Sequence, residues 1–284
     1  MKFGVMMFPA DFAMDPRMLA GAAEARGFES LFFPEHTHIP TSRRSPWPGG
    51  SDLPDEYSHT HDPFVALAMA AAVTRTLRIG TGIALVTQRD PILMAKQVAT
   101  LDHLSGGRLL LGVGAGWNAE EMAQHGTRFE DRWKLLRERV LAMRALWRED
   151  VAEFHGDFVD LEPSWAWPKP AQAGGPPVLL GASSRYAFAR IAEYCDGWMP
   201  IDGRGDGLVD GLRSLREACD AAGRDFSELD LTVFGVRGDA QRVEALAELG
   251  FHRVLFSLPP TDADTVVRWL DTLADLAADF ATSS

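Results

Sequence analysis

The chain has 284 residues, of which 46% are hydrophobic and 24% charged, a composition typical of a folded globular protein and unlike that of a disordered or fibrous one. Its formal net charge is -12 at pH 7, and no basic tract is long enough to follow a nucleic-acid backbone, which argues against nucleic acid as a partner. No window reaches the length of an apolar membrane span and the N-terminus lacks a signal-peptide pattern, so we expect a cytoplasmic protein without a membrane anchor.

Short β-rich segments recur along the chain, and each is followed by a helical pattern. Segments this apolar on both faces are typical of parallel strands that are covered by helices. The expected strands lie near residues 2–8, 30–35, 78–86, 108–116, 177–183, 197–201, 231–237 and 253–259. With eight strand–helix units and no break in composition, the sequence predicts an α/β fold in which residues 1–284 form one (β/α)8 TIM barrel domain.

Asp-Pro pairs mark three of the expected helix starts, because Asp can cap the free N–H groups and Pro already holds a helical φ. These pairs are Asp15-Pro16, Asp62-Pro63 and Asp90-Pro91. Two long insertions stand outside the repeating pattern, 37–61 after the second strand and 149–176 between the fourth and fifth strands. The second insertion alternates like a hairpin around Gly156.

The second expected strand runs directly into charged residues in "SLFFPEHTHIP". In a TIM barrel the carboxyl ends of the strands carry the active site, so Glu35, His36 and the 37–61 loop should lie at the catalytic mouth. A histidine titrates near neutral pH and can act as a general acid or base. Glu35 and His36 are therefore the candidate catalytic residues.

Histidines in "HTHIP" and "HTHDP" raise the alternative of a metal-dependent barrel hydrolase. Such a site would normally draw further imidazoles or carboxylates from later strand ends. Strands five, seven and eight end in "GASS", "GVRG" and "SLPP", without a histidine, so we expect no metal site. For His59 and His61, loop polarity or helix capping is the preferred interpretation.

Several glycines and hydroxyls near strand ends admit two interpretations. Gly112, Gly114 and Gly116 either let the fourth strand pack and turn or bring the backbone close to a planar ligand. Gly80 and Gly82 weaken a central strand unless a bulge or a close approach requires them. In "GASSR", the hydroxyls either bind an anion at a helix N-terminus or simply cap the helix.

Taken together, the segments "FPEHTHIP", "GTGIALVTQRDPILMAKQVATLDHLSGGRLLLGVGAGWNAEE", "RALW" and "CDGWMP" resemble the luciferase-like monooxygenase superfamily, in particular its branch that uses the deazaflavin coenzyme F420. The resemblance implies an F420-dependent oxidoreductase that passes a hydride between the coenzyme and a small organic substrate. It places Glu35 and His36 beside the deazaflavin ring. It also implies a non-proline cis peptide at Gly82-Ile83, against that ring.

The same resemblance implies the remaining cofactor contacts. Ala115, Gly116 and Asn118 would bind the side chain of the ring, although many relatives have a hydroxyl at the position of Ala115. The phosphate of the coenzyme would be held by Gly181, Ala182, Ser183 and Ser184. Arginines that could attract its acidic tail are Arg43, Arg44, Arg185 and Arg204.

The resemblance further favours a homodimer. The nearest alternative function is a reduced-FMN-dependent monooxygenase on the same fold, in which His36 would assist a peroxyflavin. A non-catalytic binding protein is the alternative outside enzymes.

Overall fold

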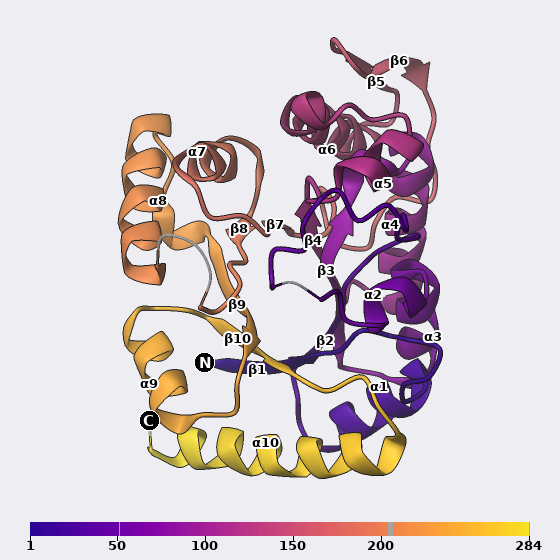
Figure 1. Cartoon of the computed structure of the whole chain (residues 1–284). Coiled ribbons are helices and arrows are strands. Elements are labelled where there is room, and N and C mark those ends of the chain that lie inside the picture. Colours follow the sequence, from indigo (N-terminus) through magenta and orange to yellow (C-terminus); the bar gives the residue numbers. More distant parts are fainter. Residues whose placement is uncertain (51, 204–206, 284) are drawn as a thin grey trace.

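The computed structural model of the protein describes residues 1–50, 52–203 and 207–283. Within these residues, eight parallel strands close into a barrel, with neighbours in chain order and the last strand paired with the first (Figure 1). The barrel strands are β1 (Lys2–Met6), β2 (Ser30–Phe33), β3 (Arg78–Leu85), β4 (Leu109–Gly114), β7 (Val178–Leu180), β8 (Gly197–Trp198), β9 (Asp230–Val236) and β10 (Arg253–Ser257). The predicted (β/α)8 barrel is thus confirmed, although every strand ends earlier than expected at its carboxyl side.

Helices surround this barrel and begin where the Asp-Pro pairs predict. The side chains of Asp15, Asp62 and Asp90 each accept a hydrogen bond from a backbone N–H in the first turn of α1, α3 and α4. The long helices are α1 (Pro16–Ala25), α3 (Pro63–Val73), α4 (Pro91–Ser105), α6 (Arg132–Arg148), α7 (Arg185–Tyr194), α8 (Leu208–Ala222), α9 (Ala240–Glu248) and α10 (Ala263–Ser283). The short ones are α2 (Glu56–His59), α5 (Ala119–Gln124), η1 (Val86–Gln88), η2 (Phe129–Asp131) and η3 (Phe226–Glu228).

The segment between β4 and β7 contains a separate hairpin, seen at the upper right of Figure 1. Strands β5 (Ala152–His155) and β6 (Asp160–Ser164) pair antiparallel, as the alternation around Gly156 predicts. Glu138 of α6 accepts hydrogen bonds from the three backbone N–H groups of 157–159, at 2.7–3.1 Å. One buried carboxylate therefore fixes the turn of the hairpin to the body of the protein.

Two apolar cores hold the architecture together. The larger one lies between the strands and the surrounding helices. The smaller one fills the barrel interior and consists of Met6, Phe32, Leu110, Leu179, Met199 and Leu255, with Ile83 and Phe234 packed against it. The interior is thus a packed core, as is usual for this fold, and leaves no room for a ligand among the described strands.

A charged network lies at the amino ends of the strands. Arg253, at the start of β10, is 0% exposed. Its guanidinium donates to both carboxylate oxygens of Glu29 at 2.8 and 2.9 Å, and to Asp230 at 2.9 Å. Burial alone would raise the pKa of Glu29 and of Asp230, but Arg253 outweighs it and holds both pKa values below their usual range. We call these three residues the lower network.

Candidate active site

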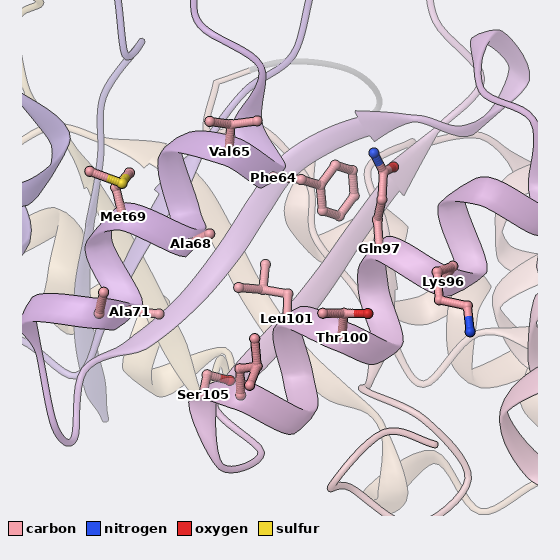
Figure 2. A pocket seen from close by; sticks show the side chains of 12 residues that line it. Phe64, Val65, Ala68, Met69, Ala71, Lys96, Gln97, Thr100, Leu101 and Ser105 are labelled. Carbon is pink, nitrogen blue, oxygen red and sulfur yellow. The ribbon is translucent and has the colours of Figure 1, made fainter. Parts of the chain in front are cut away.

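A cavity of about 290 Å³ lies at the carboxyl ends of the strands. Its lining residues follow or end most of the barrel strands: Phe8, Pro34, Glu35, His36, Trp47, Pro48, Tyr57, Gly82, Ile83, Leu85, Ala115, Gly116, Trp117, Trp133, Gly181, Ala182, Ile201 and Phe234. A wider groove of about 540 Å³ lies on the outer surface between α3 and α4, and Figure 2 shows its lining. That groove is almost entirely apolar, with Lys96 as its one charged side chain, whereas the cavity brings a carboxylate and an imidazole together.

His36 is held in place by a carboxylate from another element. Its Nδ1 lies 2.9 and 3.1 Å from the two carboxylate oxygens of Glu121, in α5. Because a carboxylate only accepts, Nδ1 carries the hydrogen and donates it. His36 is 8% exposed and Glu121 0%, so this pair is nearly dry. Nε2 of His36 is then the ring nitrogen left for a ligand in the cavity.

Glu35 is anchored by an ion pair. Its Oε1 accepts from Nε of Arg89 at 2.6 Å, and its Oε2 accepts from the backbone N–H of Leu85, also at 2.6 Å. Arg89 in turn donates to Asp62 at 2.6 Å. Glu35 is 3% exposed, and burial raises its pKa, with the positive charge of Arg89 opposing the shift.

The peptide bond between Gly82 and Ile83 is cis, which confirms the expectation from the sequence. The pairing of β3 with β4 shifts register between Thr81 and Ala84, so a bulge lies here as well. A Cβ placed on Gly114 or Gly181 would lie 1.9 or 2.7 Å from side-chain atoms of Ile83. These two glycines therefore make room for Ile83, which forms part of the cavity wall.

Aromatic rings form much of the remaining wall. The imidazole of His36 lies edge-on to Trp117 at 5.8 Å between centroids and tilted against Tyr57 at 5.2 Å. Tyr57 also contacts Trp47 and Phe8, at 5.7 and 4.6 Å. Flat apolar walls around a few fixed polar groups are typical of sites for planar heteroaromatic ligands.

Most of the residues predicted for the site line this cavity. They are Glu35, His36, Gly82, Ile83, Ala115, Gly116, Gly181 and Ala182. Three are absent from its lining. Asn118 is 2% exposed and caps α5 by accepting from the N–H of Glu121 at 3.1 Å. Ser184 caps α7 by accepting from the N–H of Ala187 at 3.2 Å, and Ser183 lies between it and Ala182.

Several of the other histidines and arginines singled out in the sequence have local partners, whereas Nη1 of Arg43 is buried without a hydrogen-bond partner in the described residues. His38 hydrogen-bonds to Gln124, and His59 lies 3.0 Å from Asp11. Arg44 pairs with Glu120, and the guanidinium of Arg185 stacks on Tyr186. Arg204 lies outside the described residues. Among the residues that the structure describes, no group of three or more His, Cys, Asp or Glu side chains could hold a metal ion.

Reasoning from the sequence missed Arg89 and Glu121. Both stand in segments that directly follow a strand, Arg89 in "TQRDP" after β3 and Glu121 in "NAEE" after β4. Since the carboxyl ends of barrel strands meet at one face, charged residues at those positions were detectable candidates. The sequence does not show that Glu35 pairs with Arg89 and that Glu121 pairs with His36.

A buried amide without a hydrogen-bond partner lies just outside the cavity lining. Both amide atoms of Gln88 are buried and have no hydrogen-bond partner within the described part of the chain. A Cβ on Gly116 would lie 3.7 Å from Nε2 of Gln88, so this amide sits directly behind the cavity wall. Gly116 has φ +80, a conformation that favours glycine and brings the backbone to the cavity.

Comparison with known proteins places these observations in a family. The model of the luciferase-like monooxygenase family matches residues 11–271. An uncharacterised protein of Mycobacterium tuberculosis is 40% identical over 277 residues, which cover 96% of this chain and 98% of that protein. The F420-dependent glucose-6-phosphate dehydrogenase of Mycolicibacterium fortuitum is 30% identical over 221 residues, covering 75% of this chain and 61% of that enzyme.

Solved structures share the fold. A monooxygenase from Streptomyces bottropensis has a TM-score of 0.82 at 21% identity and covers 99% of this chain and 100% of its own. An F420-dependent secondary alcohol dehydrogenase, in complex with an F420-acetone adduct, has a TM-score of 0.77 at 19% identity, with coverages of 97% and 98%. In the part of the chain that the structure describes, no helix is both long and apolar enough to cross a bilayer.

Proposed function

Because this chain belongs to the luciferase-like monooxygenase family, we propose that it is an F420-dependent oxidoreductase that moves a hydride between the deazaflavin and a small organic substrate. When bound, the deazaflavin supplies a two-electron hydride carrier. The observation that carries the proposal is the His36–Glu121 pair, a nearly dry imidazole and carboxylate at the wall of an apolar cavity. The relative from Mycolicibacterium fortuitum, by its name, uses the same coenzyme.

In this reaction, His36 is the proposed general acid or base that transfers the proton at the substrate oxygen. Hydride transfer to or from a carbonyl or alcohol carbon must be matched by a proton at oxygen, and a general acid or base near neutral pH provides it. Glu121 fixes the ring so that Nδ1–H points away from the ligand and Nε2 is free to exchange that proton.

Glu35 has a positioning role in the proposal. Arg89 and the backbone N–H of Leu85 hold its carboxylate rigidly, at 2.6 Å each. Leu85 ends the strand that carries the Gly82-Ile83 bulge, so Glu35 links the end of β2 to the end of β3. Ile83 and Phe234, which line the cavity, would give a bound ring apolar contacts.

Titration of the apo-protein with F420 and with FMN, followed by absorption and fluorescence spectra, tests the proposal. We expect F420 to bind more tightly. Tighter binding of FMN would overturn the assignment and favour the second candidate, a reduced-FMN-dependent monooxygenase. That candidate has its own support in the fold shared with a monooxygenase from Streptomyces bottropensis.

The same purified protein can be used to test two less favoured functions, a metal-dependent hydrolase and a non-catalytic binding protein. Metal analysis of the purified protein would detect a metal-dependent hydrolase. Tight coenzyme binding without turnover on any alcohol or carbonyl compound would indicate a binding protein.

We also propose that the enzyme is a cytoplasmic homodimer. Helix α3 carries no charged residue between Pro63 and Val73, yet Val65 and Val73 are exposed, and so is Leu104 of α4, at 79%. A helix that is apolar all round is normally covered by protein. A second copy at the groove of Figure 2 would cover it, and the molar mass from light scattering tests this, with a monomer at micromolar concentration as the contrary result.

A further inference from the structure

Two arginines beside the cavity lack a carboxylate partner. Arg132, the first residue of α6, donates from Nη1 to the carbonyl of Phe129 at 2.6 Å, while its Nε is buried without a hydrogen-bond partner. Arg190 of α7 donates from Nη1 to the carbonyl of Tyr186 at 2.7 Å. Neither forms an ion pair with any residue in the described ranges, although the chain has an excess of twelve negative charges. We call Arg132 and Arg190 the arginine pair.

The two guanidiniums share one aromatic ring. Arg190 lies 4.8 Å and Arg132 5.8 Å from the ring of Trp133, and Trp133 lines the cavity. Like charges on one ring repel each other, and burial together with the neighbouring Arg190 lowers the pKa of Arg132. Holding two cations together next to a cavity costs free energy that an anion would recover.

Nearby carboxylates do not fill that role, because other arginines already engage them. Glu130 accepts from Nε of Arg128 at 2.9 Å, and Asp131 lies 3.5 Å from the same guanidinium. Glu193, on the same helix as Arg190, accepts from Nε of Arg137 at 2.7 Å. The arginine pair is therefore left with a local excess of positive charge at the edge of the cavity.

We propose that the arginine pair is a subsite for an anionic chain, bearing phosphate or carboxylate groups, attached to the ligand whose ring fills the cavity. The guanidiniums offer planar sets of N–H donors that match such groups. The identity of the chain as the acidic tail of F420 rests on the proposed function. The subsite lies along Trp133, between the start of α6 and α7, whereas the sequence directs attention to the turn at 181–184.

The test compares intact F420 with its deazaflavin ring lacking phosphate and glutamate, by fluorescence titration of the wild type, R132Q, R190Q and the double variant. We expect each single substitution to weaken intact F420 roughly tenfold and both together roughly a hundredfold, the scale of one charge-assisted hydrogen bond each. Affinity for the tail-less ring should stay within twofold of the wild type. The Arg132→Lys and Arg190→Lys variants, which keep the charge but lose the planar donors, should fall between.

Arg216 provides a matched control, because its guanidinium also stacks on an aromatic ring, Phe226 at 3.9 Å, but away from the cavity. R216Q should bind intact F420 like the wild type, and melting temperatures of all variants report folding. Equal losses for intact and tail-less ligands, or a loss below twofold for intact F420 in the double variant, would overturn the subsite.

If the wild type binds no F420 at all, the proposed function fails and pyrophosphate becomes the probe. Thermal stabilisation by pyrophosphate that disappears in the double variant but not in R216Q supports the subsite. No stabilisation of the wild type, or equal stabilisation of the double variant, overturns it.

Discussion

Each end of the barrel holds an arginine between two carboxylates, yet the carboxyl pKa values shift in opposite directions. At the amino ends, Arg253 joins Glu29 and Asp230, and both carboxyl groups have lowered pKa values. At the carboxyl ends, Arg89 joins Glu35 and Asp62, and burial raises the pKa of Glu35. We call Arg89, Glu35 and Asp62 the upper network.

The contrast arises from what surrounds each network. The carboxylates of the lower network keep partial contact with water, with about a quarter of each side chain exposed, while the side chain of Glu35 is only 1% exposed beside an apolar cavity. Similar ion pairs thus have opposite effects on the carboxyl pKa at the two ends of the barrel. The pKa of each carboxyl group depends on how far it is withdrawn from water as much as on the arginine beside it.

The largest effect is expected at the cavity end. His36→Ala should lower turnover by about 10²–10⁴, because it removes the proposed general acid or base. His155→Ala is the matched control, since His155 also pairs with a carboxylate, Asp160 at 2.6 Å, but in the exposed hairpin. Steady-state kinetics with a competent substrate measures both, and equal turnover of the two variants would contradict the role.

The next largest effect is expected on stability, from a substitution at the amino ends of the barrel strands. Arg253→Met should lower the free energy of unfolding by about 3–5 kcal/mol, because it removes the buried cation that the partly exposed carboxylates of Glu29 and Asp230 share. Urea unfolding followed by circular dichroism measures it. Coenzyme affinity of the folded fraction should be unchanged. A loss below about 1 kcal/mol would mean that the lower network contributes little.

Glu121→Gln should give an intermediate effect and sharpen the assignment of His36. The amide keeps the shape of Glu121 but replaces a charged acceptor on Nδ1 of His36. A charge-assisted hydrogen bond contributes about 1.5–3 kcal/mol, which corresponds to roughly 10–100-fold in turnover. The pH–rate profile should change shape along with the rate. If stability falls but turnover and the pH–rate profile are unchanged, Glu121 has a structural role only.

The smallest effects are pH slopes of opposite sign at the two ends. In the fold, Glu29 has a lowered pKa, so its contribution to stability is present above its unfolded pKa and lost as pH falls. Glu35 has a raised pKa in the fold, so its contribution is fully present below its unfolded pKa and is lost as pH rises through its raised folded pKa.

Unfolding free energies measured from pH 3 to 7 test this sign difference. Relative to the wild type, Glu29→Gln should lose less stability on acidification, and Glu35→Gln should lose less as pH rises from acid. The same sign of change in both variants would contradict the comparison.

Most of the fold was predictable because its signals are local. Apolar segments of strand length and Asp-Pro helix starts depend on neighbouring residues, and they predict all eight barrel strands and the capped starts of α1, α3 and α4. Strand ends were placed too late, because residues such as Pro34 and Ala115 continue an apolar run after pairing has stopped. A strand ends where its hydrogen bonds to the neighbouring strand stop. The sequence of one segment alone does not show where that happens.

The position of the candidate site could be predicted from the sequence, but the pairing of its side chains could be predicted only in part. Glu35, His36 and the Gly82-Ile83 peptide follow from strand ends and family resemblance. By contrast, Glu121 lies 85 positions from His36 in the sequence. Pairing over that separation is decided by how strands and loops assemble, and no local pattern encodes it. Ser184 shows a second difficulty. A serine at a helix start can either cap the helix or bind a ligand, and the sequence does not distinguish the two roles.

The crowding of tryptophans around the cavity has an optical consequence. Three of the eight tryptophans, Trp47, Trp117 and Trp133, line it, while Trp147 and Trp198 are buried in the larger core. An absorbing ring bound among the first group would accept excitation energy from those indoles most efficiently, because transfer falls steeply with distance. Indole emission should therefore report occupancy of the cavity without any attached dye, and the loss of that quenching in a Trp117→Phe variant would identify which indole faces the ring.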